Sequence, residues 1–341
     1  MELVNEIVEA RNFWEAWMSV RRNKGAAGID KMSVDVLDVY MPLHMDEIKQ
    51  SICRKQYKPS PVRRVFIPKP NGKQRPLGIP TVVDRVVQQA TAQVLNRIYE
   101  PLFSEHSYGF RPNRSCHQAI NQALDYLNAG YEWVVDFDIE KYFDTVNHDK
   151  LISILREQVN DSATLHLIRS FLKSGVMEGG LVSATTEGVP QGGCISPILS
   201  NIYLDKLDKE LESRELRFVR YADDFDIFVK SERSADRVMA SVSRWLETKL
   251  RLKVSATKTK VVRPTKSVFL GFTFWKSTRG WECRPTDAAK EKLETKVKQV
   301  LVRKRATAQP MSYIFTKLNQ VIRGWVNYYY VGSCLLYTSP S

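Results

Sequence analysis

Apolar residues near the start of the chain recur at helical spacing. Leu3, Ile7, Ala10, Trp14 and Trp17 stand about 3.5 residues apart, which predicts one amphipathic helix. We expect the helix to end before NKGAAGID, whose glycines indicate a loop. Core packing is the expected role of both tryptophans.

Other segments carry the β-branched and aromatic residues of strands. They are VRRVFIPKPNGKQRPLGIP (62–80), WVVDFDI (133–139) and RFVRYADDFDIFVK (217–230). The first and third predict hairpins, the first with a basic tip at its PNG turn. In the second, Asp136 and Asp138 are two residues apart and therefore share a face. The third places Asp223 and Asp224 at its turn.

The chain also shows helical signals. Asp144, ahead of NHDKLISIL, is expected to be a helix N-cap. EGVPQGGCISP (187–197) predicts a glycine-rich loop that leads into a helix N-terminus, which suits an anionic or polar ligand. Beyond Thr286 two basic helices are predicted, so a domain boundary is expected near residue 285. The second of them should turn inward Ile314, Leu318, Val321, Ile322 and Trp325.

Length and composition narrow the class of protein. The chain has 341 residues, which favours about two domains. With 43% hydrophobic and 26% charged residues it fits a globular protein and not a disordered or fibrous one. No apolar run approaches the ~18 residues of a membrane helix, and the start has no secretory pattern. We therefore expect no membrane partner.

The net charge points to a partner. Lysine and arginine total 51 against 38 acidic residues, a net charge of +13. Cations that neutralise phosphates release counterions, so a polyanion is favoured, although a merely basic soluble protein would share this balance. The five cysteines lack metal-ligand or disulfide spacing, which predicts a reducing, cytoplasmic setting.

The acidic residues suggest a metal-dependent reaction. Phosphoryl transfer to a growing strand uses two Mg²⁺ ions, and Mg²⁺ prefers carboxylate oxygens on rigid strands. Asp138, Asp223 and Asp224 would supply such a cluster. Acids in turns are also common for purely structural reasons, so the hairpin alone does not decide.

Here the chain resembles a known family. YADDF and DIEKYFD resemble the metal-binding segments of reverse transcriptases. Six further segments resemble the group II intron branch of that family. They are VPQGGCISPILSNIYLDKLD, SYGFRP, IPKPNGKQRPLGIP, GAAGID, FLGF (the expected primer-grip hairpin) and GWVNYY. The likeness covers about residues 10–332, nearly the whole chain.

The resemblance implies a fold class and domains. It implies an α+β right-hand polymerase, with fingers and a ferredoxin-like palm sheet followed by an all-helical thumb. Residues 1–285 would form fingers and palm, with an N-terminal extension of about 1–60. Residues 286–332 would be the thumb or maturase region, expected to be truncated and to lack the endonuclease of longer members, and 333–341 an irregular tail.

The resemblance also implies roles for individual residues. Asp138, Asp223 and Asp224 would ligate two Mg²⁺ ions, and Lys258 would give a proton to the pyrophosphate. Phe143 would stack under the sugar and exclude a 2′-hydroxyl. The other residues implied to contact the nucleotide or template are Lys69, Arg75, Gln191, Arg111 and the backbone of Phe137 and Ile139.

The function implied is RNA-directed DNA synthesis. The chain would extend a primer strand on an RNA template with deoxynucleoside triphosphates, bind its group II intron RNA and assist splicing. The alternatives are an RNA-binding splicing cofactor with little polymerase activity, or a retron, diversity-generating or defence reverse transcriptase. The oligomeric state stays open, with a dimer as one option.

Overall fold

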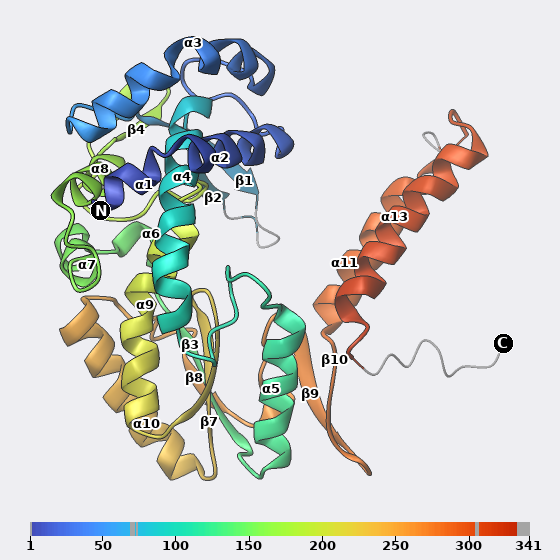
Figure 1. Ribbon diagram of the computed structural model, residues 1–341. Helices are drawn as coiled ribbons and strands as arrows, with labels where there is room; N and C mark the ends of the chain where they lie inside the picture. Colours follow the sequence, from blue (N-terminus) through green and yellow to red (C-terminus); the bar gives the residue numbers. More distant parts are fainter. Residues whose placement is uncertain (1, 69–71, 73, 304–306, 333–341) are drawn as a thin grey trace. The chain divides into compact units, whose positions relative to one another are not determined.

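The computed structural model describes residues 2–68, 72, 74–303 and 307–332 (Figure 1). The chain divides into two compact units whose segments alternate along the sequence. Unit 1 comprises the residues up to Pro112, Ile139–Glu210 and Ser243–Val254. Unit 2 comprises Asn113–Asp138, Leu211–Val242 and the residues from Ser255 onward.

Unit 1 is mainly helical. Its helices are α1 (Leu3–Ile7), α2 (Ala10–Arg22), α3 (Val34–Cys53), α4 (Val82–Tyr99), α6 (Tyr142–Thr145), α7 (His148–Leu155), α8 (Ser162–Leu172) and most of α9 (Ser196–Ser213). Apolar side chains of α1–α4 and α8 form one core, and α4 is buried around most of its circumference. Burial on all sides explains why its sequence, VVDRVVQQATAQVLNRIY, lacks a single apolar stripe.

A small sheet completes unit 1. Strands β1 (Val62–Pro68) and β2 (Gln74–Ile79) form the predicted hairpin, and β4 (Val176–Glu178) and β5 (Leu181–Ser183) extend it in the order β2-β1-β4-β5. The GAAGID loop is fixed by arginines: Arg63 donates two hydrogen bonds to the carbonyl of Ala27, and Arg85 donates to that of Ala26.

Unit 2 contains a four-stranded antiparallel sheet. Its strands are β3 (Trp133–Asp138), β6 (Arg217–Tyr221), β7 (Asp224–Val229) and β8 (Lys260–Val262), in the order β6-β7-β3-β8. With the helical connection after β3 and helix α10 (Glu232–Trp245) after β7, this is the βαββαβ arrangement of ferredoxin-like folds. The predicted palm sheet is therefore present.

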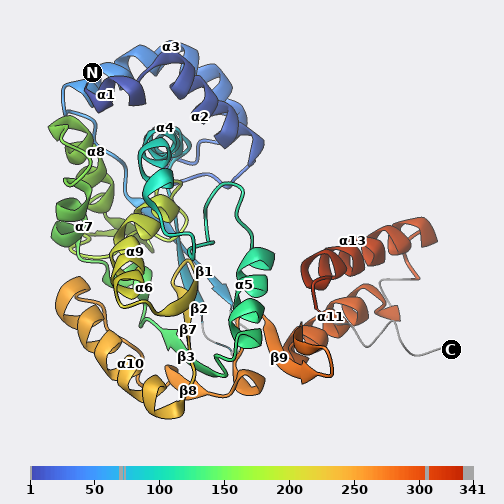
Figure 2. The same cartoon turned by 60° about the horizontal axis from the view of Figure 1, so that its bottom comes forward.

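Further elements of unit 2 lie around this sheet. They are α5 (Cys116–Asn128), the hairpin β9 (Phe272–Ser277) and β10 (Gly280–Pro285), and helices α11 (Asp287–Val300) and α13 (Met311–Tyr329). Helix α5 packs on β6 and β10. Helices α11 and α13 run side by side in both views (Figures 1 and 2), and the indole of Trp325 donates to the carbonyl of Ala289 between them.

The change to helical structure falls where the sequence predicts it, since Thr286 caps α11. The compact units are divided elsewhere, because both helices cluster with the sheet of unit 2. The inward face predicted for α13 is largely confirmed: Ile314 is buried and Leu318, Val321 and Trp325 are half-buried, but Ile322 is 43% exposed. Among the described helices, none is long and apolar enough to cross a membrane.

The N-terminal prediction needs two corrections. The expected single helix is two, α1 and α2, because the chain leaves helical geometry at Val8 and Glu9. The backbone of Val4 donates to the carboxylate of Asp161, a contact too distant in sequence to be anticipated. Trp14 is 54% exposed and does not pack in the core, whereas Trp17 is half-buried and donates to Asp38.

Candidate active site

One face of the unit 2 sheet carries four carboxylates. Asp138 on β3 lies directly opposite Asp224 on β7, and Asp136 lies opposite Asp226. Side chains opposite each other in an antiparallel pair point to the same side, so all four share a face. We call them the acidic face. The other face of the same strands is apolar, with the ring of Phe137 stacked on that of Phe225 at 4.8 Å.

Crowding of like charges perturbs these groups. Burial, and then the carboxylates of Asp136, Asp223 and Asp138, raise the pKa of Asp224 to about 7. Burial is also the main reason that the pKa of Asp226 is raised well above its ordinary value. The pKa of Asp136 is raised by burial too, and the ammonium group of Lys260 opposes that rise.

Two lysines approach the acidic face from one segment. Lys258 donates to both carboxylate oxygens of Asp138, at 3.0 and 2.8 Å, and Lys260 lies 3.3 Å from Asp136. The Lys258 ammonium is two-thirds exposed, so it can leave this ion pair without breaking a buried contact. The structure thus brings Lys258 to Asp138, as the sequence-based assignment of both residues to one site requires.

The turn between β6 and β7 holds Asp223. Ala222 has φ of +60°, which lets the two strands connect tightly ahead of the aspartates. Arg220 on β6 is fully buried, and its guanidinium donates to the carbonyl of Ala222 at 2.8 Å. A buried arginine therefore fixes the peptide next to Asp223.

The donor set suits a hard divalent cation. Carboxylate oxygens are the ligands that Mg²⁺ prefers. Burial and then the neighbouring carboxylates raise the pKa of Asp224, and a cation bound there would offset that unfavourable charge. Over the described part of the chain, no three acidic, histidine or cysteine residues are grouped closely enough to hold a metal ion as they stand. The carboxylates of the acidic face fit Mg²⁺ by their chemistry and by the strand register, while the Lys258 ammonium contacts one of them, Asp138.

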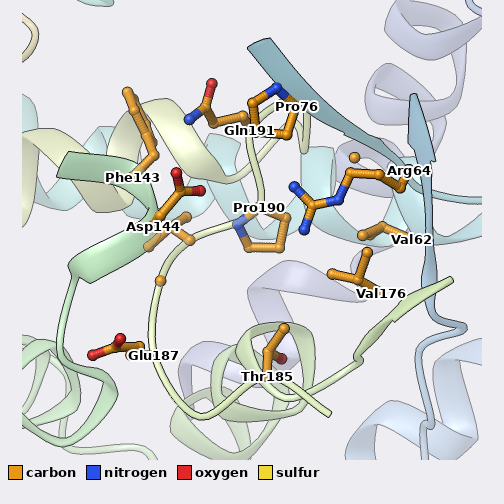
Figure 3. Close-up of a pocket in the computed structure, with 13 residues that line it drawn as sticks. Val62, Arg64, Pro76, Phe143, Asp144, Val176, Thr185, Glu187, Pro190 and Gln191 are labelled. Atoms are coloured by element: carbon orange, nitrogen blue, oxygen red, sulfur yellow. The ribbon is translucent and has the colours of Figure 1, made fainter. Parts of the chain in front are cut away.

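Unit 1 contains a cavity of about 250 Å³ (Figure 3). We call it the Phe143 pocket. Its wall comprises Val62, Arg64, Pro76, Gly78, Phe143, Asp144, Val176, Thr185, Glu187, Gly188, Val189, Pro190 and Gln191. Two residues assigned to nucleotide binding from the sequence, Phe143 and Gln191, thus line one pocket. A third, Arg75, donates from its Nε to the side-chain oxygen of Gln191 at 2.8 Å.

Backbone contacts fix the loop that lines this pocket. The amide of Val189 donates to the carbonyl of Phe143 at 2.6 Å, and the amide of Gly78 donates to that of Gln191 at 2.7 Å. A Cβ at Gly192 would lie 2.6 Å from the Gly78 carbonyl, and one at Gly188 2.9 Å from the Asp144 carbonyl. Glycine is required at both positions, because a side chain would displace β2 or α6.

Asp144 is not the helix N-cap that the sequence predicts. The N-cap of α7 is Asn147, whose side chain accepts from the amide of Lys150. Asp144 lies inside the short helix α6 and lines the pocket, which Arg64 enters from β1 (Figure 3). The Nε of Arg64 is buried and has no hydrogen-bond partner among the described residues.

Arg111 also departs from its predicted role. Its side chain is 3% exposed and forms an ion pair with Glu100 at 2.9 Å. The same guanidinium donates to the carbonyls of Ser104 and Ser107. The prediction that it touches a template or nucleotide is therefore wrong for this structure, because its donors are committed inside unit 1.

The remaining predicted residues are placed as follows. Ile139 forms a bridge with Val254 in which the hydrogen bonds fall on the residues either side, so its own N–H is not used there. Phe137 has a buried ring and lies in β3. Lys69 lies outside the described residues.

Sequence reasoning missed several residues at these two places. They are Asp226, Arg220, Arg64, Asp144 and Glu187. The strand alternation in YADDFDIF could have found Asp226, since residues two apart share a face. Nothing local marks Arg220 as buried or Arg64 as lining a cavity, because both properties depend on segments distant in sequence.

The acidic face and most of the Phe143 pocket lie within a segment of the chain that matches a known protein family. Residues 67–274 match the family described as reverse transcriptase (RNA-dependent DNA polymerase). Residues 290–335 match the group II intron maturase-specific domain. The chain belongs to the group II intron reverse transcriptases. The maturase match favours this branch over the retron and defence alternatives, and the expected right-hand polymerase fold is confirmed.

Individual relatives agree with this family. The chain is 35% identical over 290 residues to Protein YkfC of Escherichia coli, covering 73% of this chain and 76% of that protein. It is 39% identical over 209 residues to the group II intron-encoded protein LtrA of Lactococcus lactis, covering 61% of this chain. A putative COX1/OXI3 intron 2 protein of Saccharomyces cerevisiae is 34% identical over 251 residues. The chain spans 35% of LtrA and 28% of the yeast protein.

Proposed function

We propose that this group II intron reverse transcriptase is an RNA-directed DNA polymerase that extends a primer 3′-hydroxyl on an RNA template. The observation that carries the proposal is the register of β3 and β7. It places Asp138 opposite Asp224, with Asp223 adjoining in the turn, although the two strands are far apart in sequence. Like charges gathered in this way are expected where cations are bound.

Asp138, Asp223 and Asp224 are proposed to hold two Mg²⁺ ions. Bound there, the ions would activate the attacking hydroxyl and stabilise charge on the leaving pyrophosphate. The chain's own contribution is a fixed arrangement of acids, held by the sheet and by Arg220 behind the turn. Lys258 would exchange its contact with Asp138 for the pyrophosphate, to which it would donate a proton.

The Phe143 pocket is proposed to select the incoming deoxynucleotide. Arg75 would bind phosphate oxygens through two parallel N–H groups, and Gln191 holds it in place. Phe143 would pack under the sugar and leave no room for a 2′-hydroxyl. The N–H of Ile139, which its bridge with Val254 does not use, would donate to the triphosphate.

Intron binding is the second part of the proposal. The maturase-domain match and the net charge of +13 support contact with group II intron RNA, whose phosphates would pair with lysine and arginine. Assistance to splicing would follow from that binding. The RNA-binding cofactor without polymerase activity remains the competing function.

Primer extension on an RNA template distinguishes the two. We expect the parent chain to extend a labelled DNA primer with Mg²⁺ and deoxynucleotides, and Asp223→Asn to lose about a thousandfold in rate. Asp236→Asn, the same change at an exposed position on α10, is the matched control and should extend normally. Absence of extension by the parent, with intron-RNA binding retained, would establish the cofactor instead.

A further inference from the structure

The turn before β9 has unusual backbone geometry. Phe269 and Phe272 exchange both backbone hydrogen bonds, which encloses a two-residue turn at Leu270 and Gly271. Both residues have positive φ, +51° and +81°, as in a type I′ turn. Leucine rarely adopts that conformation because its Cβ is crowded there, so contacts from outside the turn would help to stabilise it.

The end of α13 contacts this turn directly. The hydroxyl of Tyr328 donates to the carbonyl of Leu270 at 3.0 Å. The ring of Tyr329 lies 4.9 Å from that of Phe272, and a Cβ on Gly271 would lie 2.8 Å from the Tyr329 hydroxyl. At the start of the first helix of the pair, the amide of Thr286, the cap of α11, donates to the carbonyl of Gly271. Both helices are thus tied to one turn.

The same turn is connected to the acidic face. Three residues before Leu270, Ser267 is fully buried and its hydroxyl donates to the Asp226 carboxylate at 3.3 Å.

We infer that Tyr328 and Tyr329 are positioning residues that set the 269–272 turn against the aspartate strands, so that the end of α13 controls how a primer is held for extension. This inference rests on the proposed polymerase function. The turn is rigid only while α13 is seated on it, because its own backbone conformation is unfavourable. A shift of the helical pair would therefore move the turn and, through Ser267, bear on β7.

Tyr328→Phe tests this inference with little disturbance. The variant keeps the ring and removes the hydrogen bond to Leu270, a loss that corresponds to roughly two- to tenfold in an equilibrium. Amide exchange at residues 269–272 should speed up by that factor, and KM for the primer–template should rise similarly. KM for deoxynucleotides should not change. Tyr313→Phe, an exposed tyrosine on the same helix, is the control and should alter neither.

A second pair of variants tests the contact from the other side. Gly271→Ala should raise KM for the primer–template further, because its methyl group meets the Tyr329 hydroxyl. Adding Tyr329→Phe removes that hydroxyl and should recover part of the loss. Two results would overturn the inference, given a parent chain that extends primers. In the first, Tyr328→Phe matches the parent in amide exchange and in KM for the primer–template. In the second, amide exchange changes but that KM does not. If the parent chain extends no primer, the proposed function is refuted. The amide exchange rates at residues 269–272 would then still test the contact between Tyr328 and Leu270.

Discussion

The acidic face and the Phe143 pocket are built by opposite means. The acidic face gathers like charges on one side of a sheet, where burial and then their mutual repulsion raise the pKa of Asp224. The pocket is held by backbone hydrogen bonds and by glycines that admit no side chain. Its lining includes Arg64 as well as the acids Asp144 and Glu187, so neither sign of charge dominates.

The difference separates two requirements of a polymerase. A cluster of carboxylates that binds cations can be unfavourable without them, because the cations then relieve the repulsion and binding is strengthened. A pocket that must recognise shape gains from rigidity before the ligand arrives. Substitutions should therefore affect stability in opposite directions at the two places.

The largest effect is expected in the pH dependence of stability without metal. The pKa of Asp224 is raised in the folded chain to about 7, from 3.8, so the folded state keeps its proton longer than the unfolded state. Stability should therefore fall as pH rises from about 4 to about 7, by up to roughly 1.4 kcal/mol per pH unit from this group. Asp224→Asn should remove the contribution of Asp224 to that slope, and the variant should be more stable than the parent at pH 8. Urea unfolding in a chelator measures both; an Asn variant less stable than the parent at pH 8 would contradict the prediction.

The pocket should respond in the other direction. Gly188 has φ of +90°, and a Cβ there would lie 2.9 Å from the carbonyl of Asp144. Gly188→Ala should destabilise the chain by about 1–3 kcal/mol and raise KM for deoxynucleotides. Gly180→Ala is the control, since Gly180 has a matching φ of +89° with no atom within 4 Å of a Cβ. Equal losses in the two variants would show that the close approach at Gly188 does not matter.

The smallest change concerns selectivity. Phe143→Ala opens the pocket beneath the proposed sugar position. Discrimination against ribonucleotides should fall about 10- to 100-fold, as expected for removing a steric contact. The ratio of kcat/KM for matched deoxy- and ribonucleotides measures this. An unchanged ratio would place the sugar elsewhere.

Much of the sheet could be predicted from sequence because its pattern is local. Alternation in WVVDFDI and YADDFDIF defines which side chains share a face, and the register then brings the aspartates together. The pairing of β3 with β7 is not a local property of the sequence. It can be expected only from the resemblance to reverse transcriptases.

The mispredicted residues share one cause. Asp144 was a plausible cap, but Asn147 competes for the same helix start and caps it. Arg111 carried no sign of its ion pair with Glu100, and Ile322 stays exposed because α11 covers only part of α13. Each outcome depends on which competing partner lies nearby in space, and periodicity does not contain that information.

The alternation of segments between the two units has a consequence for how the protein can be dissected. The chain passes from one unit to the other several times, so a cleavage or deletion at any single point between residues 113 and 254 leaves neither unit with all its parts. During synthesis, the edge of β3 that pairs with β7 also stays unpaired until the hairpin of β6 and β7 has been made. Fragments that end between these strands would expose an aspartate-bearing edge, so unit 2 should be expressed only as part of the whole chain.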